Sequence, residues 1–156
     1  MSGENLTKIV LEVEYDDGEV LTETPWAEDL GSSRYKLRNC PFYAYGVSFG
    51  DIVKAEPKYE DDDRPYLKDV VEKSGHKTVR ILLAESIKQS DSSRAILDAI
   101  SKMKCGYEGT DGTKYFVVDI TPEADFWSVC QFLTDNGVNW EHADPPYEAL
   151  YPEDAH

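Results

Sequence analysis

Basic residues are scarce in this chain. Its 156 residues include 16 Lys and Arg against 31 Asp and Glu, and its formal net charge at pH 7 is −15. Two stretches contain no Lys or Arg: residues 9–33 include eight acids, and residues 115–156 include nine. A surface of this sign repels nucleic acid and anionic membranes, and it speeds association with a basic protein through electrostatic steering. The composition disfavours nucleic-acid binding and favours a basic protein partner, unless the charge only maintains solubility.

Long apolar segments and cysteine clusters are also missing. Residues 1–5 are polar and acidic and every apolar run is short, so the sequence predicts neither a signal peptide nor a membrane span. The three cysteines, Cys40, Cys105 and Cys130, are far apart and have apolar neighbours. They predict buried free thiols in a reducing compartment, and the lack of Cys-x-x-Cys spacing disfavours a zinc site. These features predict a cytoplasmic protein.

The first half of the chain predicts a small β-sheet or barrel. Alternation from Ile9 to Tyr15, followed by the turn at residues 16–18, predicts a hairpin that returns through Val20. Helical periodicity is absent before residue 85, so residues 1–73 are assigned to a β-rich unit. The acidic run at residues 59–64 is expected to be an exposed loop. Further strands are expected at residues 34–37, 51–56 and 66–71.

The second half predicts alternating strands and helices. Val79, Ile81 and Leu83 alternate as a strand, and a helix is then expected from Ser90 until the glycine Gly106. A hairpin with its turn at residues 109–112 leads to a central strand at residues 115–120. The second helix should follow at once, capped by Thr121, with Pro122 in its first position and an end at residues 136–137. A last strand is expected at residues 138–143.

This order of elements predicts a fold. Strand, helix, strand, strand, helix, strand is the ferredoxin-like βαββαβ order, assigned here to residues 74–156 together with an irregular acidic tail. The second helix buries a stripe formed by Phe126, Val129, Cys130 and Leu133. The whole chain is thus expected to be an α+β protein, a β-rich unit and a ferredoxin-like unit packed as one compact domain.

One segment carries a family resemblance. Residues 35–53 read Tyr-Lys-Leu-Arg-Asn-Cys-Pro-Phe-Tyr-Ala-Tyr-Gly-Val-Ser-Phe-Gly-Asp-Ile-Val, with Trp-Ala-Glu at 26–28 before them. The strongest motifs are the Pro-Phe-Tyr-Ala-Tyr-Gly block at residues 41–46 and Ser-Gly-His at residues 74–76. Over most of its length the chain resembles a bacterial family catalogued as domain of unknown function 4265. The resemblance implies a shared fold and brings no activity with it, because fold alone does not determine function.

Aromatic residues crowd the centre of that block. Phe42, Tyr43 and Tyr45 lie within four positions, and Gly46 allows a tight bend beside them. Such rings usually pack in a core, which is the simpler interpretation. The alternative is that Phe42, Tyr43 and Tyr45, with His76, line a pocket for a small ligand.

The sequence offers no convincing catalytic constellation. His76 could act as a general base only if Ser74 or Asp51 lay beside it in space. Ser74-Gly75-His76 lacks the strained Gly-x-Ser-x-Gly turn that positions a serine nucleophile. Cys40 has apolar neighbours that predict burial, which quenches thiol reactivity. The chain is therefore expected not to be an enzyme.

Metal and cofactor sites are not expected either. His142 and Asp144, with Glu141 beside them, offer donor atoms, but neighbouring ligands need further ones from elsewhere in the fold. The glycines between residues 106 and 112 belong to a hairpin and lack the strand-to-helix junction of a phosphate loop.

The preferred hypothesis is an acidic binding protein that neutralises a basic partner. Specifically, it would be an immunity protein that blocks a cognate bacterial toxin domain, such as a nuclease used in interbacterial competition. The alternative is a small-molecule-binding regulatory or sensor domain, and for Trp140 and Tyr147 the alternative is ordinary packing of a terminal strand. The sequence does not determine the oligomeric state. The expected partner contacts are Trp140, Glu141, Asp144, Tyr147, Glu148 and Tyr151, with Glu60, Asp61, Asp62 and Asp63 as a second patch.

Overall fold

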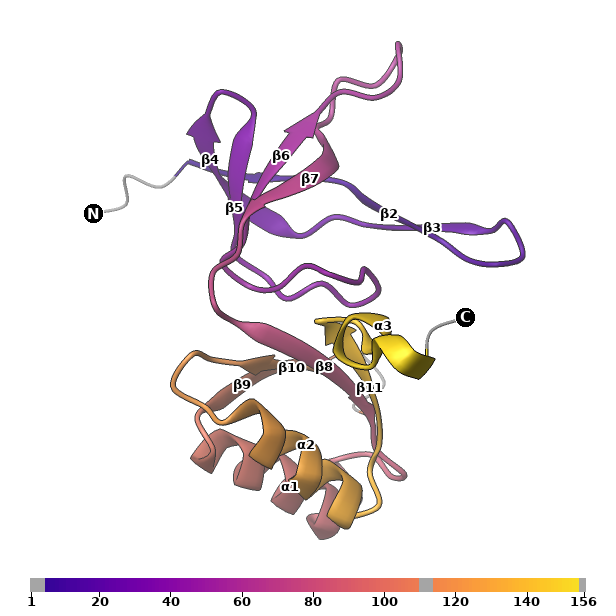
Figure 1. Cartoon of the computed structure of the whole chain (residues 1–156), viewed down its shortest axis with the longest axis vertical. Helices are drawn as coiled ribbons and strands as arrows, with labels where there is room; N and C mark the ends of the chain where they lie inside the picture. The colour runs from indigo at the N-terminus through magenta and orange to yellow at the C-terminus, as the bar shows by residue number, and fades with distance from the viewer. Residues whose placement is uncertain (1–4, 110–113, 155–156) are drawn as a thin grey trace. The chain divides into compact units, whose positions relative to one another are not determined.

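The protein is described by a computed structural model that covers residues 5–109 and 114–154. The chain divides into two compact units, Met1–Ser74 and Gly75–His156, and each has a hydrophobic core of its own. Antiparallel sheets dominate both units, and the helices all belong to the second (Figure 1). The predicted α+β class is therefore confirmed.

The first unit consists of strands and loops. Its strands are β1 (Leu6–Lys8), β2 (Leu11–Glu14), β3 (Val20–Glu23), β4 (Trp26–Gly31), β5 (Arg34–Leu37), β6 (Ile52–Glu56) and β7 (Tyr66–Glu72). The predicted hairpin around residues 16–18 is confirmed as β2 and β3, and the three further strands are found where expected. Strands β1 and β4 were not predicted, because β1 has only three residues and Glu28 and Asp29 interrupt the alternation of β4.

Five of these strands form one antiparallel sheet in the order β1-β4-β5-β6-β7. The chain after β1 reaches the opposite edge strand. The Val10 N–H donates to the Pro65 carbonyl at 2.8 Å, and the Leu67 N–H donates to the Val10 carbonyl at 2.9 Å. Buried residues such as Ile9, Leu37 and Val53 fill the interior of this unit.

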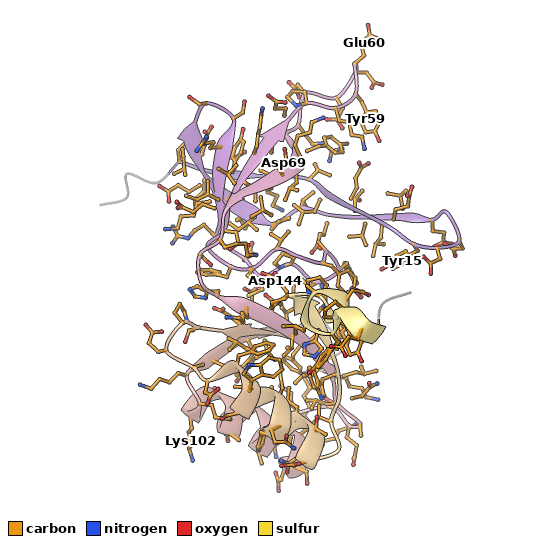
Figure 2. The ribbon with its side chains drawn as sticks, in the orientation of Figure 1. Tyr15, Tyr59, Glu60, Asp69, Lys102 and Asp144 are labelled. Atoms are coloured by element: carbon orange, nitrogen blue, oxygen red, sulfur yellow. The ribbon has the colours of Figure 1, made fainter. Side chains whose placement is uncertain are left out.

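Strands β2 and β3 leave the sheet as a two-stranded ribbon (Figure 1). Residues 14–22 are exposed throughout, and Figure 2 shows Tyr15 near the turn of the ribbon. The β6–β7 loop projects in a similar way, with Glu60 at its outer end. The acidic segment at residues 59–64 is thus an exposed loop, as predicted, apart from the half-buried Asp62.

The second unit contains four strands and two longer helices. Its elements are β8 (Lys77–Leu82), α1 (Asp91–Lys102), β9 (Cys105–Gly109), β10 (Tyr115–Ile120), α2 (Phe126–Asp135), β11 (Asn139–Asp144), α3 (Tyr147–Leu150) and a 3-10 turn at Pro152–Asp154. The sheet is antiparallel in the order β11-β8-β10-β9. Figure 1 shows α1 and α2 on the same side of this sheet. The predicted turn at residues 109–112 lies mostly outside the described residues.

Both long helices bury the stripe that the sequence predicts. Leu97 and Ile100 of α1 are buried, as are Phe126, Val129, Cys130 and Leu133 of α2. Ser90 caps α1, and its side chain accepts a hydrogen bond from the Ser93 N–H at 3.1 Å. These side chains pack against Val79, Ile81 and Val118 of the sheet and form the core of the unit.

Three local predictions were wrong. The second helix begins at Phe126 with Asp125 as its N-cap, because the Thr121 hydroxyl donates instead to the Lys104 carbonyl at 2.6 Å. The first helix ends before Gly106: Lys104 takes the left-handed conformation, with φ of 71°, and the glycine lies inside β9. The tail is not irregular throughout, since it forms α3 and the 3-10 turn. Among the described residues, none of the helices is both long and apolar enough to cross a membrane.

Candidate functional site

Five aromatic side chains of the second unit gather around His142. This group, called the aromatic cluster below, consists of Phe126, Trp127, Trp140, His142, Tyr147 and Tyr151. The Trp140 ring lies 4.7 Å from the His142 ring, and the rings of Phe126, Tyr147 and Tyr151 lie 5.9, 6.0 and 5.9 Å from it. These separations and tilted or edge-on geometries are those of favourable aromatic pairs.

Three elements bring the cluster together. Alternation along β11 places Trp140 and His142 on the same sheet face, because side chains two positions apart in a strand point the same way. The first turn of α2 adds Phe126 and Trp127, whose rings are 5.0 Å apart. The short helix α3 then adds Tyr147 at its start, and Tyr151 follows one turn later, 4.7 Å from Tyr147.

The cluster has a buried base and an exposed rim. Phe126 is 7% exposed and Trp140 is half-buried, with its indole N–H donating to the Thr134 hydroxyl at 3.1 Å. In contrast, Trp127, Tyr147 and Tyr151 are 54%, 44% and 37% exposed. Exposed Trp and Tyr side chains are typical of protein interfaces, where such residues supply much of the binding energy.

Aromatic faces and charged side chains of both signs meet at the cluster. Aromatic faces attract cations, and the Lys77 ammonium already lies 5.8 Å from the centre of the Phe126 ring. Glu123, Glu148 and Glu153 are exposed in the same stretch of chain, which contains no Lys or Arg. The cluster therefore combines aromatic faces with exposed acids from its own stretch of chain and with Lys77 of β8.

His142 occupies the centre of the cluster as a neutral ring. Its Nδ1 is buried and has no hydrogen-bond partner among the described residues. Burial lowers the pKa of His142 below its ordinary value, because the charged form loses hydration. Neutral imidazole stacks with its neighbours as an aromatic ring, so His142 contributes to the packing of the cluster at neutral pH.

The structure brings together some of the predicted partner contacts. Trp140, Tyr147 and Tyr151 lie in the aromatic cluster, and Glu148 is exposed on α3 between the two tyrosines in sequence. Glu141 lies on the opposite side of β11 from Trp140, by strand alternation, and accepts from the guanidinium of buried Arg80 at 3.2 Å. Asp144 is 5% exposed, so its side chain is not available at the surface.

The second predicted patch lies in the first unit. Glu60, Asp61 and Asp63 are exposed in the β6–β7 loop. Asp62 instead accepts hydrogen bonds from Arg64 at 2.8 Å and from the Tyr66 hydroxyl at 2.6 Å. Arg64 and Tyr66 hold the pKa of Asp62 well below its usual range, because both stabilise the charged carboxylate. Asp62 shapes this loop, while its three neighbours face solvent.

The predicted ligand-pocket residues come from both units. Tyr43 and Tyr45 are 38% and 48% exposed, and Phe42 is half-buried. The Glu23 carboxylate accepts from the backbone N–H groups of Phe42, Tyr43 and Ala44 at 2.7 to 2.9 Å. The motif at residues 41–46 is therefore a loop held by one carboxylate, with Ala44 in the core of the first unit and Tyr43 and Tyr45 exposed.

Tyr45, one of the predicted pocket residues, borders a hollow in the first unit. This hollow has a volume of about 610 Å³, and Tyr45 shares its lining with Tyr59, Tyr66 and Val47. Phe42 and Tyr43 are not among its lining residues. His76 belongs to the second unit, where its Nδ1 lies 2.6 Å from Asp119.

The neighbours proposed for a catalytic His76 are engaged elsewhere. The Ser74 hydroxyl donates to the Phe49 carbonyl at 2.6 Å. The fully buried Asp51 carboxylate accepts from the Lys73 ammonium at 2.5 Å and from the Ser74 N–H at 2.8 Å. These contacts fix the end of β7 to the loop after β5, which is a structural role.

The cysteines are free and buried, as the sequence predicts. Burial raises the pKa of both Cys105 and Cys130 to about 11, so neither forms a thiolate at neutral pH. Among residues 5–109 and 114–154, His, Cys, Asp and Glu side chains do not gather in groups able to hold a metal ion.

Sequence reasoning missed two members of the aromatic cluster and misread a third. It assigned Phe126 to the helix core, passed over Trp127 and considered His142 only as a metal donor. One signal was available for Trp127: it falls beside the buried helix stripe, where an exposed tryptophan is unusual. The gathering around His142 required the position of α3, which no periodicity predicts.

Comparison with known proteins identifies a family. The model of the family described as domain of unknown function (DUF4265) matches residues 23–142. The chain belongs to this family. None of the curated proteins matches it. The match confirms the resemblance seen in the motifs of the first unit, and it extends through α2 and most of β11 of the second.

A solved structure shares the fold of this family member. A crystal structure of a hypothetical protein from Neisseria gonorrhoeae is similar with a TM-score of 0.74. The likeness covers 90% of this chain and 96% of that protein, at 14% sequence identity. At this identity the similarity extends to the fold and carries no function with it.

Proposed function

We propose that this DUF4265 protein binds and neutralises a basic protein. The partner class that fits is a toxin domain of interbacterial competition, for example a nuclease, which makes this chain its immunity protein. The observation that carries the proposal is the aromatic cluster, with Trp127, Tyr147 and Tyr151 exposed in a stretch free of Lys and Arg. Large rigid rings supply binding energy, and the negative field supplies fast encounter and selectivity for a basic surface.

The docking surface proposed here is the rim of the aromatic cluster together with Glu148. A nuclease binds phosphates with Lys and Arg, and an acidic surface can cover that basic groove. The rings would stack on Arg side chains of the partner, as Phe126 already does with Lys77. Glu60, Asp61 and Asp63 form the second, purely electrostatic patch. Asp144 is not part of the proposed docking surface, because its side chain is buried.

The proposal includes a finer description of the fold. The strand order β11-β8-β10-β9 corresponds to 4-1-3-2 within the second unit, with both helices on one face, and supports a ferredoxin-like fold. In the first unit, the pairing of Val10 with Tyr66 links the segment after β1 to β7 and supports a small barrel. Cytoplasmic location is also part of the proposal, supported by three free, buried thiols.

A small-molecule sensor is the second candidate function. The hollow beside Tyr45 supports it, since three tyrosines and apolar residues can surround a ligand of moderate size. An enzyme is not proposed. His76 pairs with Asp119, while Ser74 and Asp51 hold the β7 end, so these side chains serve the fold.

The test begins with the tagged protein expressed in its native host. We expect a basic protein domain to co-purify in stoichiometric amount at low salt and to leave as the salt rises, because screening weakens charge attraction. The partner, identified by mass spectrometry, is then produced separately and its affinity measured by calorimetry. A toxin partner should lose its activity when the complex forms.

Matched variants locate the docking surface. Trp127→Ala should weaken binding of the purified partner at least tenfold, or about 1.4 kcal/mol, as for an interface hot spot. Trp26→Ala is the control, because Trp26 is a similarly exposed tryptophan of the first unit, at 46% against 54%. A clean protein without partner, from cells shown to express the neighbouring genes, would reject the proposal; equal effects of the two variants would reject the surface.

A further inference from the structure

A second feature of the second unit lies away from the aromatic cluster. Helices α1 and α2 lie on the same sheet face (Figure 1), and a cleft of about 920 Å³ opens between them at one end of the sheet. This volume falls within the range of about 300–1,000 Å³ that is typical of small-ligand sites.

The floor of the cleft is apolar. Ile96 of α1, Phe132 of α2 and Val138 just before β11 line it, and each is a partly buried residue packed against the core. On the α1 side the cleft is lined by small side chains such as Ala95 and Ala99. The cleft is therefore open because its lining residues on α1 are small. A hydrocarbon chain bound there would remove the apolar floor from water.

The charge at the cleft has the opposite sign to that of the protein. Lys114 is the only charged side chain among the described residues that line it, in a chain with 31 acids and 16 bases. The first turn of α1, with Ser92 and Ser93, also borders the cleft at the positive end of the helix dipole, and the acid of this turn, Asp91, is paired with Arg94. Both groups favour an anionic end on the ligand, and the amide of Asn139 adds a polar contact.

We propose that this cleft binds a small apolar carboxylate. The hydrocarbon part lies against Ile96, Phe132 and Val138, and the carboxylate lies at Lys114. This site is separate from the proposed protein-docking surface and does not depend on it. The ligand would be a carboxylate of medium chain length. Apolar contacts would supply affinity, and Lys114 would supply selectivity for an acid over an alcohol.

The probe is decanoate, added to the full chain below its micelle-forming concentration and followed by amide chemical shifts in NMR. We expect saturable shifts at Ala95, Ala99 and Asn139, and weaker binding of decan-1-ol. Lys114→Gln should weaken decanoate binding about three- to fivefold, the effect of one exposed ion pair. Lys102→Gln is the matched control, because Lys102 is an exposed lysine of α1 outside the cleft lining.

A second variant tests the apolar floor. Ala99→Phe should fill the cleft and abolish decanoate binding, while Ser101→Phe, on an exposed position of the same helix, should leave it intact. Amide spectra of both variants establish that they are folded. The proposal is overturned if decanoate gives no saturable shifts at the cleft, if it binds Lys114→Gln as tightly as the original chain, or if folded Ala99→Phe still binds it.

Discussion

The two acidic stretches without Lys or Arg use their carboxylates alike but their aromatic residues differently. In residues 9–33, Glu12 pairs with Lys58 and Glu23 accepts three backbone N–H groups. In residues 115–156, Asp119 pairs with His76 and Asp125 caps α2. In both stretches, some of the carboxylates therefore stabilise the fold.

The aromatic residues separate the two stretches. In the first, Tyr15 and Trp26 are exposed at separate points of the β-rich unit, and Trp26 is covered on one face by Lys8, 5.1 Å from its ring. In the second, five rings gather around His142. Acidity alone therefore does not distinguish the two stretches. The gathering of rings at the second does, and the docking surface is proposed there for that reason. Four predictions test this difference, from the largest effect to the smallest.

Glu23→Gln should produce the largest loss of stability. The neutral amide cannot reproduce a carboxylate that accepts from three backbone N–H groups, so we expect the first unit to lose about 2 kcal/mol of unfolding free energy. Native-state hydrogen exchange at the buried Val53 amide measures this unit alone. Glu19→Gln, at an exposed position of the ribbon, should change it by less than about 0.5 kcal/mol. Equal losses of unfolding free energy in Glu23→Gln and Glu19→Gln would show that Glu23 does not hold the loop and acts only as a surface charge.

Glu148→Lys should slow association with the basic partner. Reversing a charge beside the exposed tyrosines weakens the steering field where docking takes place, and we expect an association rate about three- to tenfold lower at low salt. Stopped-flow fluorescence with the purified partner measures the rate. Glu19→Lys makes the same charge change in the first stretch and should have the smaller effect. If the ribbon variant slows association more, the docking surface lies in the first unit.

Glu12→Gln should destabilise the first unit slightly more than Glu14→Gln. The hydrogen bond from Lys58 lowers the pKa of Glu12, so its stabilisation is present above the ordinary pKa of Glu and is lost as pH falls through the lowered value. Glu14 is exposed on the same strand and is the matched control. Chemical unfolding at pH 7 and at acid pH compares them. A difference that persists at acid pH would contradict the ion-pair explanation.

His142→Phe should remove a weak pH dependence. Burial lowers the folded pKa of His142, so the unfolded chain binds the proton more readily and stability falls as pH drops below about 6.5. The phenylalanine variant keeps a ring in the cluster and should show a flatter profile between about pH 5 and 7. The control variant His76→Gln keeps His142, so it should retain the part of the pH dependence of stability that arises from His142. An unchanged profile in His142→Phe would mean that another group titrates.

Local chemistry explains which elements were predictable. The β2–β3 hairpin follows from alternation and an Asp-Gly turn, and both helix stripes follow from a 3.6-residue period. The start of α2 was misplaced because Thr121 and Asp125 are both good caps, and only the contact of Thr121 with Lys104 decides between them. The position of Lys104 in the left-handed conformation likewise depends on where β9 must begin.

The candidate sites divide in the same way. Composition predicted four of the proposed partner contacts: Trp140, Tyr147, Glu148 and Tyr151. Trp127 could be added only from the tertiary structure, because its ring meets that of Tyr151 beside His142. Asp144 looked like a surface acid and is buried. The cleft between α1 and α2 could not be predicted from the sequence, because it is lined by small residues of α1 that face α2 at one end of the sheet.

By itself the sequence determined the sign of the charge, the α+β class, the family and the periodic faces of the helices, because these depend on residue type and short-range spacing. The tertiary structure alone decided which rings meet at His142, which carboxylates hold the backbone, and where a cleft stays open. Those features depend on contacts between residues far apart in the chain, and packing selects them from many side chains with equal local preference.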